Sequence, residues 1–160
     1  DGLTGILNHA TLMAELDYAI AFAQRHGEPL CFLMLDLDHF KRINDTHGHL
    51  VGDQVLVHVA RIFRKAIRGS DLLGRYGGEE FGIILRKCPP ANGRATAEKL
   101  RLALADSPIT LPGSDPIPLH VSIGVGAFPG SGTTATTVAE AADQALYKAK
   151  SSGRNRVEMG

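Results

Sequence analysis

The feature that most restricts the fold is a short apolar segment, Leu30 to Leu35, which runs directly into the acidic pair Asp36 and Asp38. The segment is far shorter than the roughly 20 residues that a membrane span needs, and it lacks the alternation of a strand with one solvated face. We therefore predict a central strand that is buried on both faces. Such a strand needs helices on both sides, so the segment favours an α/β fold.

Helical and strand-like patterns alternate along the rest of the 160 residues. An apolar stripe at helical spacing lies between a capping Asn8 and a terminating Gly27. The same reasoning predicts further helices at about 53–67, 95–105 and 138–149, and strands at 72–76, 81–85, 119–128 and 156–159. Stretches with glycine or proline at 44–52, 89–93, 107–118 and 129–134 are expected to be connections. We predict one domain over residues 1–160, with a mixed sheet flanked by helices.

Composition excludes several kinds of function. The 17 basic and 17 acidic residues give a net charge of zero, so we expect no nucleic-acid binding through a general positive charge. No apolar run is long enough to span a bilayer, so no membrane contact is expected of this domain. The two cysteines, Cys31 and Cys88, form no C-x-x-C motif, which favours a reducing, cytoplasmic compartment. Because the chain begins at Asp1, we expect it to be part of a longer protein, for which a membrane anchor stays open.

If the predicted hairpin lies beside the central strand, three or four carboxylates are expected to converge at one end of the sheet. Asp36 and Asp38 end the central strand, and Glu79 and Glu80 follow two glycines on the turn of a predicted hairpin. Hard cations such as Mg²⁺ prefer oxygen ligands, and protein-bound Mg²⁺ commonly bridges to substrate phosphates. The pattern therefore indicates phosphoryl or nucleotidyl transfer, while the absence of a Walker A loop argues against a P-loop enzyme. The alternative is a set of solvated loop carboxylates without a ligand.

Cationic residues suited to phosphate lie elsewhere in the sequence. Lys41 is close to the acidic pair, whereas Lys150 and Arg154 end the last predicted helix, where they could equally complement the helix dipole. Four further basic residues fall along one helical face: Arg61, Arg64, Lys65 and Arg68. A solvated charged face and an anion site are both compatible with this stripe.

Five segments of the chain form an ordered set of motifs. Residues 75–81 read R-Y-G-G-E-E-F. The others are D-G-L-T-G-I-L-N at the start, D-L-D-H-F-K-R-I-N-D from residue 36, G-H-L-V-G-D from residue 48, and A-D-Q-A-L-Y-K-A-K from residue 142 with the following G-R-N. The set resembles the GGDEF family, the diguanylate cyclases, in its common GGEEF form. The resemblance covers the whole chain in the family's order.

The resemblance implies roles for the acidic residues. Asp36, Glu79 and the backbone carbonyl of Leu37 would bind Mg²⁺, with Mn²⁺ as a substitute, and Glu80 would support the second metal position. Glu79 is also the usual candidate for accepting the proton of an attacking 3′-hydroxyl. Together with Glu80 and Lys41 it forms the expected catalytic set.

The resemblance also implies contacts to the substrate GTP. Asn44 and Asp53, with His49 nearby, would read guanine, because a carboxylate accepts hydrogen bonds from guanine N1–H and N2–H₂ and adenine offers no matching pair. The expected contacts to the triphosphate are Lys41, Lys150 and Arg154.

The implied reaction condenses two GTP molecules into cyclic di-GMP and two pyrophosphates. The family fold is similar to the palm of polymerases and class III nucleotide cyclases, in agreement with the α/β prediction. Each domain would hold one GTP, so catalysis requires a homodimer about a two-fold axis, promoted by N-terminal sensory segments of the parent. The alternative is a catalytically silent GGDEF domain that serves as a receptor for GTP or cyclic di-GMP. The intact acidic motifs favour the enzyme.

A further segment resembles the family's inhibitory site, R-x-x-D, at which the product binds. Arg68 and Asp71 have this spacing, and five residues separate Asp71 from Gly77. Arg68 would meet phosphate or guanine through its planar guanidinium, and Asp71 would accept hydrogen bonds from guanine. Lys99 occupies about the place of the second basic residue. The resemblance therefore predicts allosteric inhibition by cyclic di-GMP.

Overall fold

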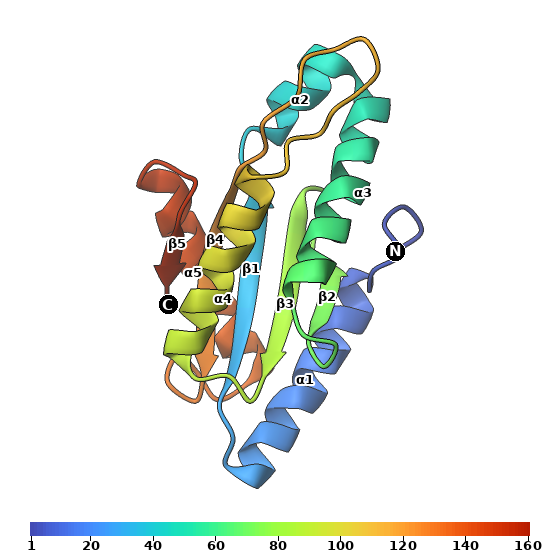
Figure 1. The fold of residues 1–160 in the computed structure, drawn as a ribbon. Coiled ribbons are helices and arrows are strands. Elements are labelled where there is room, and N and C mark those ends of the chain that lie inside the picture. The colour runs from blue at the N-terminus through green and yellow to red at the C-terminus, as the bar shows by residue number, and fades with distance from the viewer.

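The apolar segment forms the middle strand of a five-stranded sheet in the computed structural model, which describes all residues 1–160 (Figure 1). In chain order the elements are α1 (His9–His26), β1 (Leu30–Leu37), α2 (Phe40–His47), α3 (His49–Ala66), β2 (Leu72–Arg75), β3 (Glu80–Arg86), α4 (Pro90–Ala105), β4 (Val121–Phe128), α5 (Ala135–Ser151) and β5 (Val157–Met159).

The strand order is β2–β3–β1–β4–β5. β1 pairs antiparallel with both β3 and β4, β2 pairs antiparallel with β3, and β4 pairs parallel with β5. All eight residues of β1 are buried. The predictions of a central strand and of an α/β fold with a mixed sheet are both confirmed.

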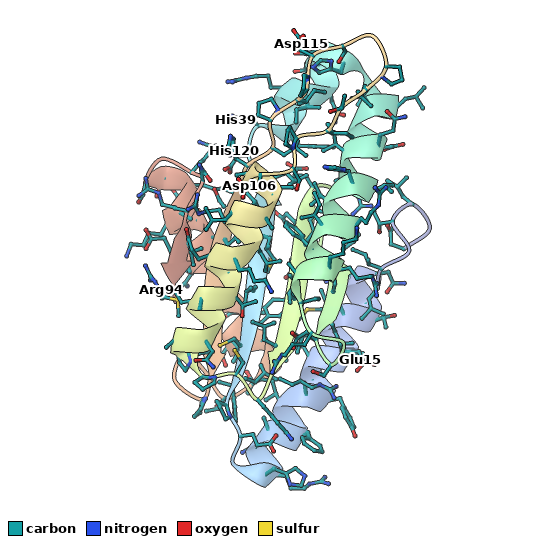
Figure 2. All side chains as sticks on the ribbon, in the orientation of Figure 1. Glu15, His39, Arg94, Asp106, Asp115 and His120 are labelled. Atoms are coloured by element: carbon teal, nitrogen blue, oxygen red, sulfur yellow. The ribbon has the colours of Figure 1, made fainter.

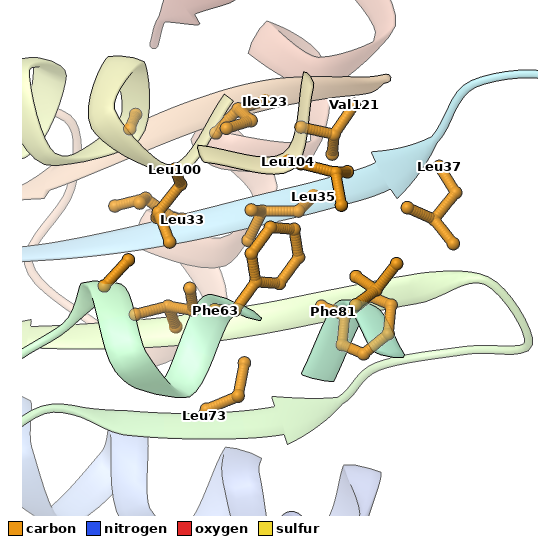
Figure 3. Packing of buried hydrophobic residues seen from close by; sticks show 14 of the residues in the cluster. Leu33, Leu35, Leu37, Phe63, Leu73, Phe81, Leu100, Leu104, Val121 and Ile123 are labelled. Atoms are coloured by element: carbon orange, nitrogen blue, oxygen red, sulfur yellow. The ribbon is translucent and has the colours of Figure 1, made fainter. Parts of the chain in front are cut away.

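Helices cover both faces of the sheet. α3 and α4 pack on one face, where Leu33 and Leu35 of β1 lie in one cluster with Phe63 of α3 (Figure 3). The rings of Phe63 and Phe81 meet edge to face, with centroids 5.6 Å apart. α1 and α5 cover the other face, where β1 contributes Phe32. Because side chains alternate along a strand, β1 supplies both cores.

The ends of α1 agree with the prediction. The side chain of Asn8 accepts a hydrogen bond from the backbone N–H of Thr11 at 2.8 Å, which satisfies one of the free donors of the first turn. Gly27 ends the helix in the left-handed conformation, with φ of 62°. None of the five helices combines the length and the apolar character that a bilayer span requires.

The sequence predicts a polar connection at residues 44–52, and this prediction is wrong. α2 occupies residues 44–47, and α3 begins at His49, four residues before the predicted start. The two helices are separated only by Gly48, whose φ of 90° turns the chain. Gly52, which suggested a loop, lies inside α3 and leaves room for the side chain of Asn44.

The break predicted at residues 89–93 is also wrong, because α4 starts at Pro90. Proline is well suited to the first helical position, where no backbone N–H is needed. Gly93 does not end a helix but packs its backbone on β1. A Cβ at this position would lie 2.5 Å from Cys31 Sγ.

Gly124 of β4 permits the close contact between β4 and α5. A Cβ there would lie 2.1 Å from the carbonyl oxygen of Ala142 and 2.3 Å from the backbone nitrogen of Leu146. Neither backbone atom can yield without moving the helix, so Gly124→Ala is expected to lower the free energy of unfolding by about 2 kcal/mol. Urea unfolding measures the change. Gly69→Ala, where a Cβ meets nothing within 4 Å, is the matched control. Equal stability of the two variants would contradict the argument.

Candidate active site

One cleft of about 450 Å³ lies where β1 ends, α2 begins and the β2–β3 hairpin turns. Its lining residues are Asp36, Leu37, Asp38, His39, Phe40, Lys41, Arg42, Asp45, Glu79, Lys150 and Arg154. The structure thus brings together six residues that the sequence predicts for the site: Asp36, Leu37, Lys41, Glu79, Lys150 and Arg154. Carboxylates and cations that are far apart in the sequence share one opening.

Asp36 is the buried carboxylate of the cleft. The ammonium group of Lys150 donates to its Oδ2 at 2.5 Å. Burial raises the pKa of Asp36, and the neighbouring charges of Glu79 and Asp38 act in the same direction, whereas Lys150 partly offsets them. This carboxylate therefore needs a positive partner, and Lys150 provides one.

Arg75 shapes the hairpin turn. Its guanidinium donates to the carbonyl of Gly77 at 3.2 Å and to the carbonyl of Gly78 at 2.7 Å. It also forms an ion pair with Asp1 at 3.0 Å, which ties the start of the chain to the turn. Arg75 is absent from the predicted site residues, although its place directly before Tyr-Gly-Gly could have indicated a role in the turn.

The turn holds two carboxylates beside the end of β1. Glu80 lies directly opposite Asp36 in the register of β1 and β3, and the carbonyl of Glu79 accepts a hydrogen bond from the N–H of Leu37 at 3.3 Å. Burial raises the pKa of Glu80, followed by the charge of Asp36, while Lys150 lowers it. Several carboxylates thus compete for the positive charge of one lysine.

These groups fit a divalent cation. Carboxylate and carbonyl oxygens are the donors that Mg²⁺ prefers, and the Lys150 ammonium already occupies a cation position at Asp36. In the present arrangement no three histidine, cysteine, aspartate or glutamate side chains are set to hold a metal ion. In this arrangement Lys150 supplies the positive charge that Asp36 needs.

Removing the charge of Glu80 is expected to stabilise the metal-free domain. Because the pKa of Glu80 is raised, the stability that this group contributes is present below its ordinary pKa and is lost as the pH rises through the raised value. Glu80→Gln should therefore raise the free energy of unfolding by about 1 kcal/mol at pH 7 and leave it nearly unchanged near pH 4.

Urea unfolding at both pH values tests this, with the exposed Glu140→Gln as control. Added Mg²⁺ should stabilise the native sequence more than the variant. A gain of the same size at both pH values would show that charge is not its cause.

Asp38 lines the cleft with Asp36 and Glu79, and both of its oxygens also have partners in the protein. Its Oδ1 accepts a hydrogen bond from Ser122 Oγ at 2.6 Å, and its Oδ2 accepts one from the N–H of Asn155 at 2.9 Å. Arg154 and Asn155 both adopt left-handed conformations, with φ of 63° and 48°. Asp38 thus anchors the bend that brings Arg154 to the cleft.

α2 begins at the cleft. His39 precedes it in a left-handed conformation and makes no capping hydrogen bond through its side chain, so the N–H groups of the first turn stay open to an anion. His39, His47 and His120 line a neighbouring cavity of about 320 Å³. Figure 2 shows His39 and His120 at this end of the sheet.

Residues 1–156 match the family described as "Diguanylate cyclase, GGDEF domain". The chain belongs to the GGDEF family. The diguanylate cyclase DgcP of Pseudomonas aeruginosa is 44% identical over 99% of this chain and 23% of its own length. The response regulator PleD of Caulobacter vibrioides is 40% identical over 98% of this chain and 35% of its own length. The chain thus spans only about a quarter to a third of these relatives.

The fold of a solved GGDEF domain agrees with this assignment. The GGDEF domain of DgcB from Caulobacter crescentus, crystallised in complex with c-di-GMP, superposes with a TM-score of 0.93 at 36% identity, covering 99% of this chain and 94% of that chain. The palm-like α/β fold expected from the resemblance is confirmed.

Three predicted guanine contacts of the GGDEF domain lie outside the lining of the cleft, at the corner between α2 and α3. Asn44 Oδ1 is buried against Gly52 and has no hydrogen-bond partner. His49 and Asp53 are exposed on α3, and Asp53 lines a separate opening together with Leu50. In Figure 1 this corner extends beyond the end of the sheet.

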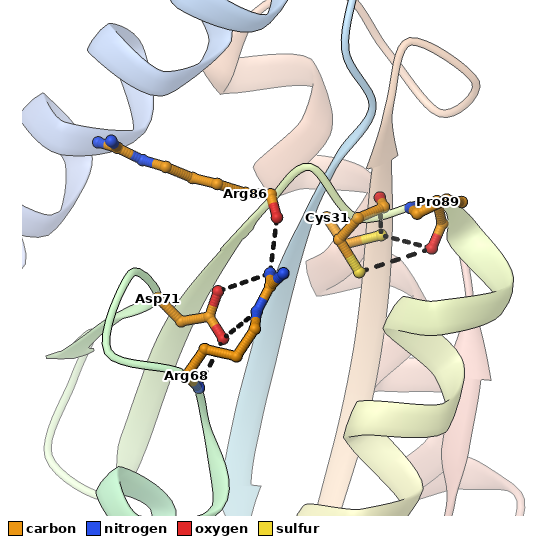
Figure 4. A network of polar contacts seen from close by, with 6 residues as sticks. Cys31, Arg68, Asp71, Arg86 and Pro89 are labelled. Atoms are coloured by element: carbon orange, nitrogen blue, oxygen red, sulfur yellow. Dashed lines mark hydrogen bonds and ion pairs between the residues drawn. The ribbon is translucent and has the colours of Figure 1, made fainter.

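The R-x-x-D segment forms a closed ion pair. Arg68 donates to Asp71 Oδ1 at 2.8 Å and to Oδ2 at 3.1 Å, and its Nη2 also donates to the carbonyl of Arg86 at 2.6 Å (Figure 4). The hydrogen bond to Asp71 raises the pKa of Arg68 further. Lys99 is exposed on α4 and is not among the residues that line the cavity beside Arg68, whereas Arg86 and Lys87 are.

Proposed function

We propose that the domain is a diguanylate cyclase that condenses two GTP molecules into cyclic di-GMP and two pyrophosphates. The observation that carries this proposal is the cleft, in which Asp36 and Glu79 lie together with Lys41, Lys150 and Arg154. Carboxylates beside several cations suit a triphosphate with its divalent metal. Membership of the GGDEF family and the similarity to a named diguanylate cyclase support the same reaction.

In this reaction the 3′-hydroxyl of one GTP attacks the α-phosphorus of the other, and pyrophosphate leaves. Asp36, Glu79 and the carbonyl of Leu37 would hold Mg²⁺, or Mn²⁺ in its place, and Glu80 would support a second metal position. The metal, when bound, would supply positive charge to the reacting phosphate oxygens. Glu79 accepts the proton of the attacking hydroxyl, since this residue lines the cleft. The three cations of the cleft offset the negative charge of the triphosphate.

The corner between α2 and α3 suits a guanine base. Asn44 Oδ1 is buried without a donor, an arrangement that costs about 1–3 kcal/mol until one arrives. The N1–H and N2–H₂ groups of guanine are such donors, and adenine lacks the matching pair. Asp53 and His49 complete the guanine-reading set. The orphaned acceptor therefore favours GTP over ATP.

Catalysis requires two domains. One cleft holds one GTP, so two copies face each other about a two-fold axis and bring the two nucleotides together. Because this chain spans only part of its relatives, we expect segments outside these 160 residues to promote the pairing.

The proposal includes product binding at Arg68 and Asp71. The c-di-GMP complex of the related DgcB domain supports a cyclic dinucleotide as the ligand. A cavity of about 330 Å³ beside Arg68 carries the cations Arg86 and Lys87, which suit the two phosphates. Lys99 remains a predicted contact. Loss of inhibition in Arg68→Ala, with turnover otherwise retained, is the expected sign of this site.

Incubation of the domain with GTP and Mg²⁺, followed by liquid chromatography with mass detection, tests the activity. Cyclic di-GMP should form at high protein concentration. A second preparation with a dimerising tag fused at Asp1 distinguishes a lack of catalytic competence from a lack of dimerisation. Product that forms only with the tag would mean that the cleft is competent and that other segments supply the pairing. No product in either preparation would contradict the proposal and leave a nucleotide receptor.

A further inference from the structure

The two cysteines of the chain converge at the start of α4, although they are 57 positions apart in the sequence. Cys31 Sγ lies 3.4 Å from the carbonyl oxygen of Cys88 and 3.7 Å from that of Pro89. Cys88 Sγ lies 3.6 Å from the same Pro89 oxygen. Both thiols thus approach the same carbonyl oxygen, that of Pro89. Nothing in the proposed reaction uses this pair.

The two thiols are not equivalent. The neighbouring Cys88 and burial raise the pKa of Cys31, so this thiol keeps its proton. The neighbouring Cys31 lowers the pKa of Cys88; burial and the charge of Asp71 oppose this shift, whereas the positive charge of Arg68 adds to it. Cys88 therefore has the character of a nucleophile, and Cys31 that of a resolving partner.

Cys88 lies just beneath the surface. Although it is only 4% exposed, its neighbours Lys87 and Pro89 are both exposed. Lys87 adopts a left-handed conformation, with φ of 48°, which is unfavourable for a residue with a side chain. A local opening of this connection between β3 and α4 would therefore expose Cys88 without disturbing the sheet.

We propose that Cys31 and Cys88 form a redox-responsive pair, which hydrogen peroxide oxidises to an intramolecular disulfide and small thiols reduce again. The Cys88 sulfur attacks one peroxide oxygen, the O–O bond breaks, and a sulfenic acid and one water are formed. The Cys31 sulfur then attacks the sulfenic sulfur, the S–O bond breaks, and a second water leaves. Two thiols lose two electrons in total, and the peroxide gains both.

The pair lies beside the R-x-x-D segment. Cys88 is two residues beyond Arg86, whose carbonyl accepts the hydrogen bond from Arg68. Oxidation therefore acts on the connection that also holds the Arg68 guanidinium, and Arg68 in turn promotes the reactivity of Cys88.

Intact-mass analysis of the folded domain after treatment with peroxide tests the disulfide. We expect the loss of two hydrogen atoms from a chain that remains monomeric, reversed by a thiol reductant, and a cross-linked peptide that contains Cys31 and Cys88. With Cys31→Ser, a dione probe specific for sulfenic acids should label Cys88. With Cys88→Ser, Cys31 should stay unlabelled. Urea unfolding shows whether each serine variant is folded, and an alanine variant replaces one that is not.

The rate of oxidation tests the part played by Arg68. Arg68→Ala should slow the loss of thiols by roughly threefold or more, because less thiolate is present at Cys88. Arg64→Ala, which removes an exposed arginine of α3, should have no effect. The proposal would be overturned if disulfides formed only between chains, if the thiols reacted only in urea, or if the probe labelled Cys31 in place of Cys88. Equal oxidation rates for the two arginine variants would show that Arg68 does not influence Cys88.

Discussion

Glu79→Ala is expected to reduce the formation of cyclic di-GMP by about 10²- to 10⁴-fold, the range typical of a lost catalytic carboxylate. Glu79 lines the cleft with Asp36, and no other residue of the hairpin turn does so. Arg75 and the N–H of Leu37 hold the turn through backbone carbonyls, so the position of the turn does not depend on the Glu79 side chain. The variant should therefore keep its fold and lose its catalytic activity.

Product formation by the dimerised domain, followed at saturating GTP, measures this effect. Glu140→Ala removes an exposed carboxylate of α5 and serves as control. Glu79→Gln separates charge from size, since the amide keeps the shape and removes both the metal-binding charge and the base. Turnover of Glu79→Ala within a few-fold of the native rate would remove Glu79 from the catalytic set, while urea unfolding shows whether the variant is folded.

The sequence predicts elements well where local chemistry and burial agree. The apolar run of β1 is buried throughout, and Asn8 and Gly27 end α1 through side-chain and backbone geometry that depends only on near neighbours. Residues 72–85 pair as an antiparallel hairpin for the same reason. In each case the residues of one segment determine its secondary structure, and contacts with the rest of the fold favour the same structure.

The prediction of helices and loops fails where a glycine serves close packing inside a helix and not a turn. Gly52 and Gly93 suggest loops, but each lies in a helix and makes room for a side chain from another element. The ion pair of Lys150 with Asp36 joins residues that are 114 positions apart. Asp38 accepts hydrogen bonds from Ser122 Oγ and from the backbone N–H of Asn155. Such long-range pairings carry no local pattern. The motifs indicate which residues come together, whereas the contacts that Lys150 and Asp38 make can be seen only in the folded structure.

Gly52→Ala is expected to raise the KM for GTP by about 100-fold, because it displaces a group that we assign to guanine recognition. A Cβ at Gly52 would lie 1.8 Å from Asn44 Oδ1 and 3.3 Å from Phe40 Cζ. The severe overlap is with the end of a flexible side chain, so Asn44 can rotate away at little cost in stability. The free energy of unfolding should fall by no more than about 1 kcal/mol.

Steady-state kinetics and urea unfolding of the same preparation distinguish this expectation from general damage. Asn44→Ala should reproduce the rise in KM, since both changes remove the Asn44 amide from the corner between α2 and α3. Gly69→Ala, which introduces a Cβ into open space, should leave KM unchanged. If Gly52→Ala raised KM while Asn44→Ala did not, the α2–α3 corner would matter through its shape, and guanine would be recognised by other groups. Because Asn44 Oδ1 has no partner in the protein, we expect the two variants to agree.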